Sequence, residues 1–492
     1  MILIDLDYAL EKKIEHDLWT VIFKNEISFK QEQLKEHNQN QAKRAEIQAS
    51  LQALYEYARG YYMKLLQDVI QSYQFSHSIC KLTFSFSRQR TDDHPQCKEA
   101  SIQYFIQHIL VHVGDLHRYS NHIDLAKTFY QYAIQTIPCL GQPYNQIAIL
   151  HEMKNPLSLL TPEQNQLITG YYYIRSIAIK VPFPLAIANL EKLFQRLKEF
   201  PLTRYEQPVK ECLTLFLQII AMINLEFQME QLPSFIQLFQ TLIIQNFHPT
   251  HFLQMLTILM FTIHRTLGLL PRSTSAKQPD RQFDFVFQVF ILILEQCFEG
   301  LQVPLSVMII EEQQFLPILY LSLAYLTNIQ KSKEDLFEHA MFKQKPSMWN
   351  SLAKLLRSFG VHAASLDAHP SSNESLFIKY TDYPLAEERT LECFTPLNEI
   401  FKGYQWKKYD QKEYLSEKDE RQLRKLRLVA MVRNFCQKVD ETSKKKVFDY
   451  LLTYVKGDLV YFESTNPAVQ QIPSSSFGAP GDRRTTQVCH EK

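Results

Sequence analysis

The stretch HVGDLHRYSNHIDLAKTFYQYAIQTIP, residues 112–138, contains a helical repeat. When Gly114 is placed at the glycine of the tetratricopeptide template, the other template positions fall in register. They are Ala126, Tyr130, Ala133 and the closing Pro138. Because such a repeat is a pair of helices that buries its apolar face against neighbouring pairs, the stretch predicts an all-α chain of stacked helical hairpins.

A second, looser copy of the pattern begins at Pro143. Its matching positions are Tyr144, Ile147 and Ala148 in the first helix and Gly170, Ile174, Ile177 and Pro182 in the second. Residues 155–170, NPLSLLTPEQNQLITG, fall between the two helices. We interpret them as an insertion that enlarges this hairpin.

Helical patterns cover most of the remaining chain, which has only 11 glycines for tight hairpin turns. One long amphipathic helix is predicted over 2–34 and another over 45–72, with a loop over 75–99. Further helices are expected at 208–226, 231–246, 250–267, 283–298, 315–328 and 348–363. The charged stretch 410–428 favours a solvated helix face over a nucleic-acid patch.

A chain of 492 residues predicts two or three domains, since a domain has about 100–200 residues. We expect an N-terminal domain over 1–200, a helical-hairpin domain over 201–463 and a disordered polar tail over 464–492.

Composition excludes several protein classes. The 53 Lys and Arg and the 52 Asp and Glu nearly cancel to +1, so no global field attracts nucleic acid. The eight cysteines form no C-x-x-C pair and no zinc-type spacing with histidines, and we expect no metal, cofactor or catalytic residue. The N-terminus lacks a secretory pattern, and apolar runs stop short of the ~20 residues that span a bilayer. We expect a cytoplasmic protein, with shuttling to the nucleus left open.

Gly60 lies among aromatic residues in YEYARGYYMKLL, inside the helix predicted over 45–72. A helix-interior glycine costs about 1 kcal/mol relative to alanine, which favours a close approach by another helix or another chain. A tolerated exposed glycine is the equal alternative.

Arg118 is not required by the repeat. On a helix with roughly 100° per residue, Asp115 and Arg118 point away from the packing side that carries Gly114, and towards the concave groove of a helical array. Tyr119 follows Arg118, and Asn145 holds the equivalent position in the next repeat. Arginine, phenol and amide donors suit an oxyanion. An ordinary surface ion pair between Arg118 and Asp115 is the alternative that spacing alone favours.

Five stretches of the chain resemble the SMG family of nonsense-mediated mRNA decay adaptors, which is related to the telomerase-associated Est proteins. They are LIDLDYALEKKIEHDLWTVIFKNEI, ILVHVGDLHRYSNHIDLAKTFYQYAIQTIPCLGQPYNQIAIL, YYYIRSIAIKVPFPLAIANLEKLF, YPLAEERTLECFTPL and RQLRKLRLVAMVR. The resemblance implies an N-terminal domain of 14-3-3-like fold with tetratricopeptide-type repeats, followed by a helical-hairpin domain.

The same resemblance implies a phosphoserine pocket. Lys24 of DLWTVIFKN and Arg118 of GDLHRYS match the family's phosphate-binding residues. Tyr119, Asn145 and Asn189 match residues with which 14-3-3 proteins hold a phosphopeptide. For Arg175 of YYYIRSIAIK a helix-surface role is favoured over support of the pocket. The insertion at 155–170 is expected to reshape one rim of the groove.

The resemblance therefore implies a non-enzymatic decay adaptor that binds phosphorylated serine or threonine sites on the up-frameshift RNA helicase. It also implies a heterodimer with an SMG-five-like partner, for which Gly60 is the candidate interface residue. We expect no nuclease-like PIN domain of the kind that other members carry, and because the tail after about residue 463 is short, we expect any recruitment of decay enzymes to be indirect. One alternative is an Est-type protein, either telomerase-associated, a nuclease or nucleic-acid-binding. The other is a plain tetratricopeptide-like scaffold for unphosphorylated peptides.

Overall fold

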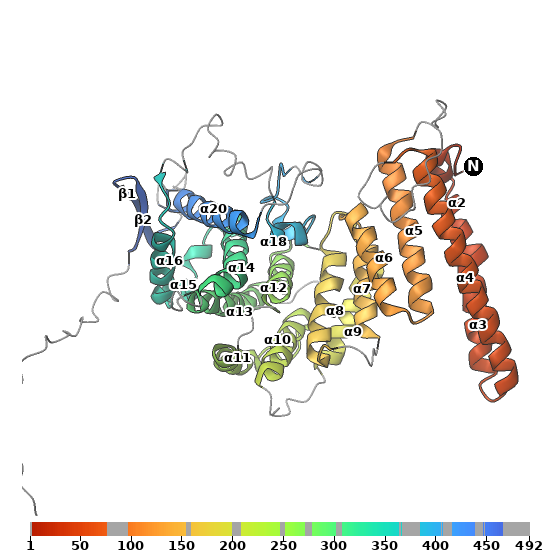
Figure 1. Ribbon diagram of the computed structural model, residues 1–492. Coiled ribbons are helices and arrows are strands. Elements are labelled where there is room, and N and C mark those ends of the chain that lie inside the picture. The colour runs from red at the N-terminus through yellow and green to blue at the C-terminus, as the bar shows by residue number, and fades with distance from the viewer. Residues whose placement is uncertain are drawn as a thin grey trace, which may run out of the picture.

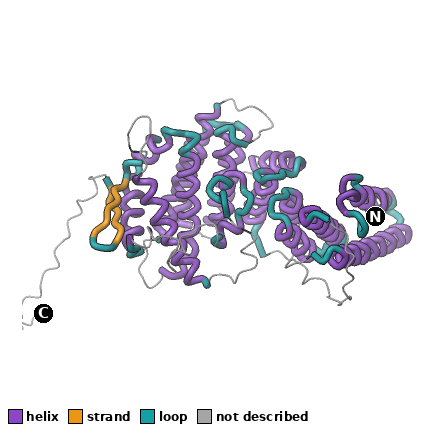
Figure 2. The backbone as a smooth tube through the Cα atoms, turned by 90° about the horizontal axis from the view of Figure 1, so that it is seen from above, coloured by secondary structure: helices purple, strands orange, loops and turns teal. Residues whose placement is uncertain are grey.

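The computed structural model shows an extended row of helices, with the N-terminal helices at one end and a short β-hairpin at the other (Figures 1 and 2). It describes residues 2–75, 97–153, 159–198, 208–246, 251–270, 278–301, 308–363, 366, 384–404, 406, 416–437, 446 and 448–465. The all-α prediction is confirmed. Most of the loop expected over 75–99 and nearly all of the expected tail lie outside the described residues.

The N-terminal segment is not the single helix predicted over 2–34. It forms α1 (Leu6–Glu11), α2 (Ile14–Asp17), the π-helix η1 (Leu18–Lys24) and α3 (Asn25–Glu36). Asp5 caps α1 through the backbone N–H of Tyr8, and Lys13 then adopts a left-handed conformation with φ of 56°. A left-handed residue ends a helix, and apolar spacing carries no signal for it. The next helix, α4 (Gln41–Ser72), matches the prediction.

The repeat of residues 112–138 forms a hairpin of α5 (Glu99–Tyr119) and α6 (Ile123–Thr136). Gly114 faces α6, where a Cβ atom would collide with the ring of Tyr130. Ala126, Tyr130 and Ala133 are fully buried beside it. The template glycine is therefore required by the close approach of the two helices.

The next hairpin consists of α7 (Gln142–Glu152) and α8 (Pro162–Ile177), and α9 (Leu185–Lys198) follows. The insertion expected over 155–170 is wrong in its second half, which belongs to α8. Thr161 and Gln164 form a capping box that starts this helix at Pro162.

The remaining helices confirm the five predicted between 208 and 328. They are α10 (Pro208–Leu225), α11 (Leu232–Asn246), α12 (Phe252–Thr266), α13 (Pro279–Gly300) and α14 (Met308–Ile329). Shorter elements follow: η4 (Leu336–Glu338), α15 (Ala340–Lys343), α16 (Pro346–Ser358), α18 (Ala386–Thr390), η6 (Thr395–Leu397) and α20 (Glu417–Gln437). None of the described helices is long and apolar enough to cross a membrane.

A two-stranded antiparallel sheet near the C-terminal end was not predicted. Strands β1 (Leu451–Lys456) and β2 (Leu459–Ser464) pair through a tight turn at Gly457, whose φ is +62°. The stacked rings of Tyr454 and Tyr461 cover one face. The sequence did contain a signal for this hairpin, because Gly457 and Asp458 lie between two runs of β-branched and aromatic residues.

Buried apolar side chains form two cores. The first core runs from Leu6 to Leu150, and the second runs from Ala148 to Phe462. They meet in α7, whose residues Ile147 and Ala148 belong to different cores. The place where the two cores meet does not define the domains, and the expected domain boundary near residue 200 stays a prediction.

Candidate functional site

Asp115 is the centre of a hydrogen-bond network among α5, α6 and α7. Its Oδ1 atom accepts from Nη2 of Arg118 at 3.0 Å, from the hydroxyl of Tyr130 at 2.6 Å and from Nε2 of Gln146 at 2.7 Å. Asp115 is 6% exposed. The ion pair with Arg118 that spacing favoured is therefore present, but its carboxylate is buried and shared with two other donors.

The network continues through two asparagines to α9. Nδ2 of Asn145 donates to Oε1 of Gln146 at 3.3 Å, and Nδ2 of Asn189 donates to Oδ1 of Asn145 at 3.0 Å. We call the residues that link α5, α6, α7 and α9 in this way the polar row: Arg118, Asp115, Tyr130, Gln146, Asn145 and Asn189. It joins three of the predicted site residues.

The two asparagines differ in exposure. Asn145 is 2% exposed, whereas Asn189 is partly exposed at the end of the polar row. Asn189 therefore presents its amide at the partly exposed end of the polar row, and Asn145 fixes its orientation from behind.

Arg118 is held on several sides. Its Nε donates to the hydroxyl of Tyr130 at 3.3 Å, and its Cζ lies 4.5 Å from the ring centroid of Tyr119. Burial disfavours its charge, but Asp115 and Tyr130 outweigh burial and raise the pKa of Arg118, so the group stays a cation. The Arg118 side chain is 17% exposed, so part of its guanidinium reaches solvent.

Lys24 stands apart from the polar row at the end of η1. It is exposed and has no ion-pair partner among the described residues. The segment around Lys24 packs mainly on α4. Phe23 lies 5.5 Å from the ring of Tyr62, and Gln31 donates to the hydroxyl of Tyr55. The segment reaches α5 at Trp19, which stacks on His112 at 4.1 Å.

Sequence reasoning missed two members of the polar row. Gln146 carries the network from Asp115 to Asn145, and Tyr130, expected only as a core residue, also binds Asp115. Gln146 carried only a weak signal in the sequence, a second amide beside Asn145 in a helix that also contains Gln142, His151 and Glu152. An amide needs a partner where it is buried, and the spacing did not predict that burial.

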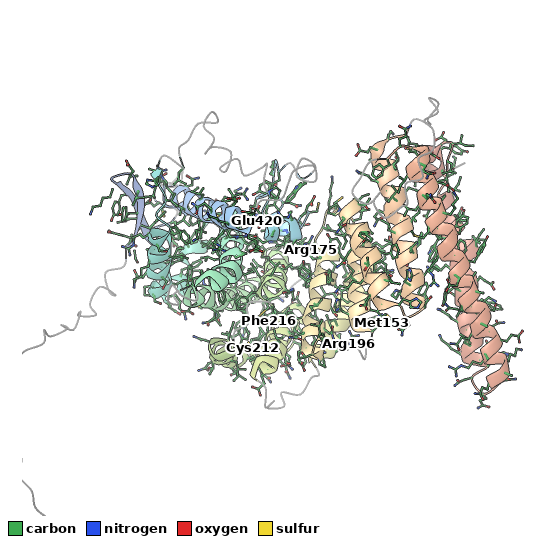
Figure 3. The ribbon with its side chains drawn as sticks, viewed as in Figure 1. Met153, Arg175, Arg196, Cys212, Phe216 and Glu420 are labelled. Atoms are coloured by element: carbon green, nitrogen blue, oxygen red, sulfur yellow. The ribbon has the colours of Figure 1, made fainter. Side chains whose placement is uncertain are left out.

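Arg175 does not lie on a helix surface as predicted. It is fully buried, and its guanidinium donates to the carbonyls of Thr390 and Glu392 and to the hydroxyl of Tyr144. Figure 3 labels its position in the chain. Arg175 thereby ties α8 to a segment more than 200 residues later and to the residue next to Asn145. The position of Arg175 on its own helix could not indicate these partners, because they lie far away in the sequence.

The charged stretch 410–428 is not a fully solvated face either. In its helix α20, Arg424 forms a bidentate pair with Glu387 at 2.6 and 2.7 Å, and Arg427 pairs with Glu388 at 2.8 Å. These four side chains are buried. They come from the two C-terminal stretches that resembled the SMG family.

Gly60 lies on an exposed face of α4. No atom of the described chain would lie within 4 Å of a Cβ atom there, so the close approach by another helix of this chain is ruled out for the described residues. Tyr57, one turn earlier, is 67% exposed, and Val21 and Ile22 on η1 are 65% and 54% exposed.

Among the described residues, no three His, Cys, Asp or Glu side chains gather to hold a metal ion.

Comparison with known proteins identifies relatives along most of the chain. Residues 13–124 match the family model of telomerase activating protein Est1, and residues 126–401 match that of the Est1 DNA/RNA binding domain. The chain is 29% identical to the zebrafish (Danio rerio) nonsense-mediated mRNA decay factor SMG7, over 81% of this chain and 33% of that protein. It is 26% identical to zebrafish SMG5, over 40% of this chain and 18% of that protein.

The structure resembles a chain of the Caenorhabditis elegans SMG5–SMG7 complex, with a TM-score of 0.52 and 16% identity over 88% of this chain and 91% of that chain. This likeness supports the helical fold. The chain spans about a third of the zebrafish SMG7 that it matches. The family model of the Est1 DNA/RNA binding domain alone matches more than half of the chain. The resemblance found in the sequence is therefore confirmed, and this chain belongs to the Est1 family with an SMG7-type sequence.

Proposed function

We propose that this chain is a non-enzymatic adaptor in nonsense-mediated mRNA decay, which binds phosphoserine or phosphothreonine sites on the up-frameshift RNA helicase. The observation that carries the proposal is the polar row, which links Arg118 to Asn145 and Asn189 across three helices. The similarity to SMG7, a factor of this decay pathway by its name, supports the biological setting.

Arg118 is the primary phosphate ligand in this proposal. A phosphoserine carries about −1.5 to −2 charges near neutral pH, and a guanidinium with donors to spare binds such an oxyanion in a fork. Asp115, Tyr130 and Tyr119 hold Arg118 in place before the ligand arrives. Less ordering is then needed on binding, which favours affinity.

Lys24 supplies the second positive charge from η1. Its exposed ammonium group has no acidic partner in the described protein, so it can turn towards a phosphate without breaking an ion pair. Asn189 then holds the peptide backbone at the other end of the polar row, supported by Asn145.

An SMG5-like protein is the proposed partner of the N-terminal helices. Support comes from the exposed apolar side chains of Tyr57, Val21 and Ile22 and from the open space above Gly60. Exposed apolar patches of this kind are typical of protein interfaces. The similar worm structure is a complex of SMG5 and SMG7. We propose that this adaptor works in the cytoplasm, and the proposal leaves open whether it also shuttles to the nucleus.

Nucleic-acid binding is the second candidate, because the family model that matches 126–401 is described as a DNA/RNA binding domain. The net charge of +1 argues against it, since nucleic-acid-binding domains are strongly basic. The net charge of the whole chain says nothing about a local basic patch, so the binding experiment includes RNA as a ligand.

A matched pair of peptides tests the function. We would titrate the protein by calorimetry with a Ser-Gln peptide from the helicase, phosphorylated and unphosphorylated, and with single-stranded RNA of similar length. Binding of the phosphopeptide alone supports the adaptor. Equal binding of both peptides would make the chain a plain scaffold, and tighter binding of RNA would favour the second candidate.

A further inference from the structure

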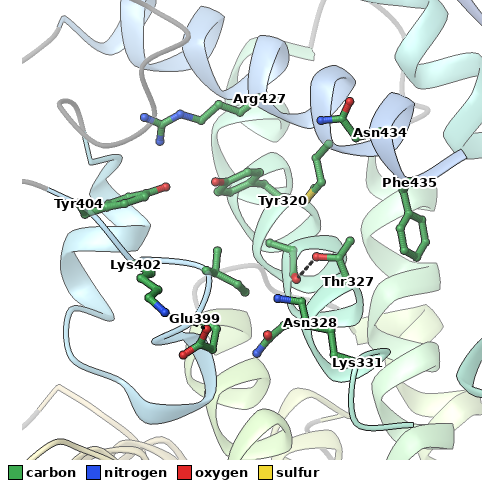
Figure 4. Close-up of a pocket in the computed structure, with 13 residues that line it drawn as sticks. Tyr320, Thr327, Asn328, Lys331, Glu399, Lys402, Tyr404, Arg427, Asn434 and Phe435 are labelled. Atoms are coloured by element: carbon green, nitrogen blue, oxygen red, sulfur yellow. Dashed lines mark hydrogen bonds and ion pairs between the residues drawn. The ribbon is translucent and has the colours of Figure 1, made fainter. Parts of the chain in front are cut away.

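A pocket of about 510 Å³ opens between α14, α20 and the segment that follows η6. Figure 4 shows Tyr320, Thr327, Asn328 and Lys331 on one side, Glu399, Lys402 and Tyr404 on another, and Arg427, Asn434 and Phe435 from α20. We call it the α14/α20 pocket. Its volume lies in the range of small-ligand sites.

One wall of this pocket is held rigid by Glu388. The hydroxyls of Tyr320 and Tyr404 donate to Glu388 Oε1 at 2.7 and 2.9 Å, and Arg427 and the backbone of Leu385 donate to Oε2 at 2.8 and 2.6 Å. Glu388 and Tyr320 are 0% and 4% exposed. Both oxygens of this buried carboxylate are hydrogen-bonded, which keeps the side chains around it in one arrangement, so this wall is formed before any ligand binds.

The mouth of the pocket is positively charged. Lys331 and Lys402 are exposed there, and Glu399 is the acidic side chain among the lining residues. Glu399 lies 3.9 Å from Lys402 with both side chains mostly exposed, which is a weak pair. Lys331 has no ion-pair partner within the described ranges. Since Arg427 is neutralised by Glu388, the mouth retains one positive charge.

Apolar side chains line the pocket beside this charge. Ala324, Ile400, Met431 and Phe435 contribute aliphatic, thioether and aromatic surface. Methionine adapts its shape to a bound ring and makes favourable contacts with it. The amide of Asn434 is exposed at the rim, and that of Asn328 is oriented by a hydrogen bond to the carbonyl of Pro396 at 3.3 Å.

We propose that the α14/α20 pocket is a second ligand site, which binds an anionic group carried on a ring-sized apolar body. The lysines at its mouth attract the anion, and the surface formed by Ile400, Met431 and Phe435 takes the ring. An aryl phosphate has this chemistry, whether it is a free small molecule or the side chain of a phosphotyrosine.

This site is independent of the proposed phosphoserine pocket. The polar row lies on α5, α6, α7 and α9 and packs against the first core and the start of the second, whereas the α14/α20 pocket is built from residues 320–435. An Arg118→Ala variant should weaken phosphoserine binding and keep its affinity for the ligand of this pocket. Failure of one proposal is thus distinguishable from failure of the other.

Ligand-observed NMR on the full chain, with phenyl phosphate as the probe, tests the proposal. We expect a Kd on the order of 1 mM or tighter for a molecule of this size. Phenol and inorganic phosphate, which each carry half of the chemistry, should bind at least about tenfold more weakly. Acetyl-phosphotyrosine amide identifies the source: tighter binding than phenyl phosphate indicates a peptide, and equal binding indicates a free small molecule.

Variants at exposed positions locate the site without risk to the fold. Combining Lys331→Ala with Lys402→Ala should weaken phenyl phosphate binding about three- to tenfold, and Asn434→Glu should weaken it through repulsion. Lys418→Ala, which removes an exposed charge on α20 outside the pocket, is the matched control. Unchanged binding in both pocket variants, or an equal loss in the control, would overturn the proposal.

Discussion

The side-chain amide of Asn189 donates to the Oδ1 atom of Asn145 at 3.0 Å, although the two residues lie 44 positions apart on α9 and α7. Through Gln146 and Asp115 this contact continues to Arg118 on α5. Replacing Asn189, the outer residue, and Asn145, the inner residue, should therefore have different effects on stability.

Asn189→Ala should weaken phosphopeptide binding about fivefold and lower the free energy of unfolding by less than Asn145→Ala does, because the bond that it removes lies at the partly exposed end of the polar row. Asn145→Ala should also lower the free energy of unfolding by about 1–3 kcal/mol, because it leaves Gln146 partly unsatisfied in a buried place. Urea denaturation and calorimetric titration measure both. Equal effects of the two substitutions on stability would contradict the inner and outer roles.

The buried pair of Glu388 and Arg427 should be essential for the C-terminal fold. Glu388→Gln leaves the guanidinium of Arg427 buried without its counter-charge, and we expect a loss of about 3–5 kcal/mol in the free energy of unfolding. Glu11→Gln is the control, since Glu11 pairs with Lys12 at an exposed site. Comparable losses in the two variants would show that burial of the pair is irrelevant.

Stability should fall in mild acid because of His264. Burial lowers its pKa from 6.5 to about 4, and its Nδ1 lies 2.7 Å from the Tyr325 hydroxyl. A group with a lowered folded pKa contributes stability above its unfolded pKa, and this is lost as the pH falls from 6.5 towards 4.

At pH 5 the loss should be on the order of 2 kcal/mol relative to pH 7. His264→Phe should remove this part of the pH dependence in urea denaturation. An unchanged pH profile in the variant would assign the acid sensitivity to other groups.

Gly60→Glu should abolish co-purification with an SMG5-like partner while preserving the melting temperature. The space above Gly60 is open in the described chain, so a new side chain there meets nothing within the protein but blocks close approach by another. Gly114→Ala is an instructive contrast, since it should destabilise the monomer through collision with Tyr130. Undiminished co-purification of the Gly60 variant would place the interface elsewhere.

Residues with a local signature were predictable from the sequence, whereas those with distant partners were not. Apolar spacing identified the long helices, and the template identified Gly114 through its short-range contact with Tyr130. Arg175 was misplaced because its acceptors, the carbonyls of Thr390 and Glu392, lie more than 200 residues away. Lys13 interrupts a helical pattern through its own backbone angle, which side-chain spacing does not encode.

The candidate site shows the same division. Spacing found the pair of Arg118 and Asp115, the repeat indicated Asn145, and the family resemblance added Asn189. Neither source indicated that Gln146 would join them, because that link depends on how α7 packs against α5.

Calorimetric titration of one phosphoserine peptide into the wild type, Lys24→Glu and Arg118→Ala tests the central claim most directly. Lys35→Glu, with the same charge reversal at an exposed position of α3, is the control. We expect Lys24→Glu to lose binding at an unchanged melting temperature, and Arg118→Ala to weaken it by about ten- to a hundredfold. Wild-type affinity in both variants would contradict the phosphoserine pocket and leave Arg118 as a structural partner of Asp115.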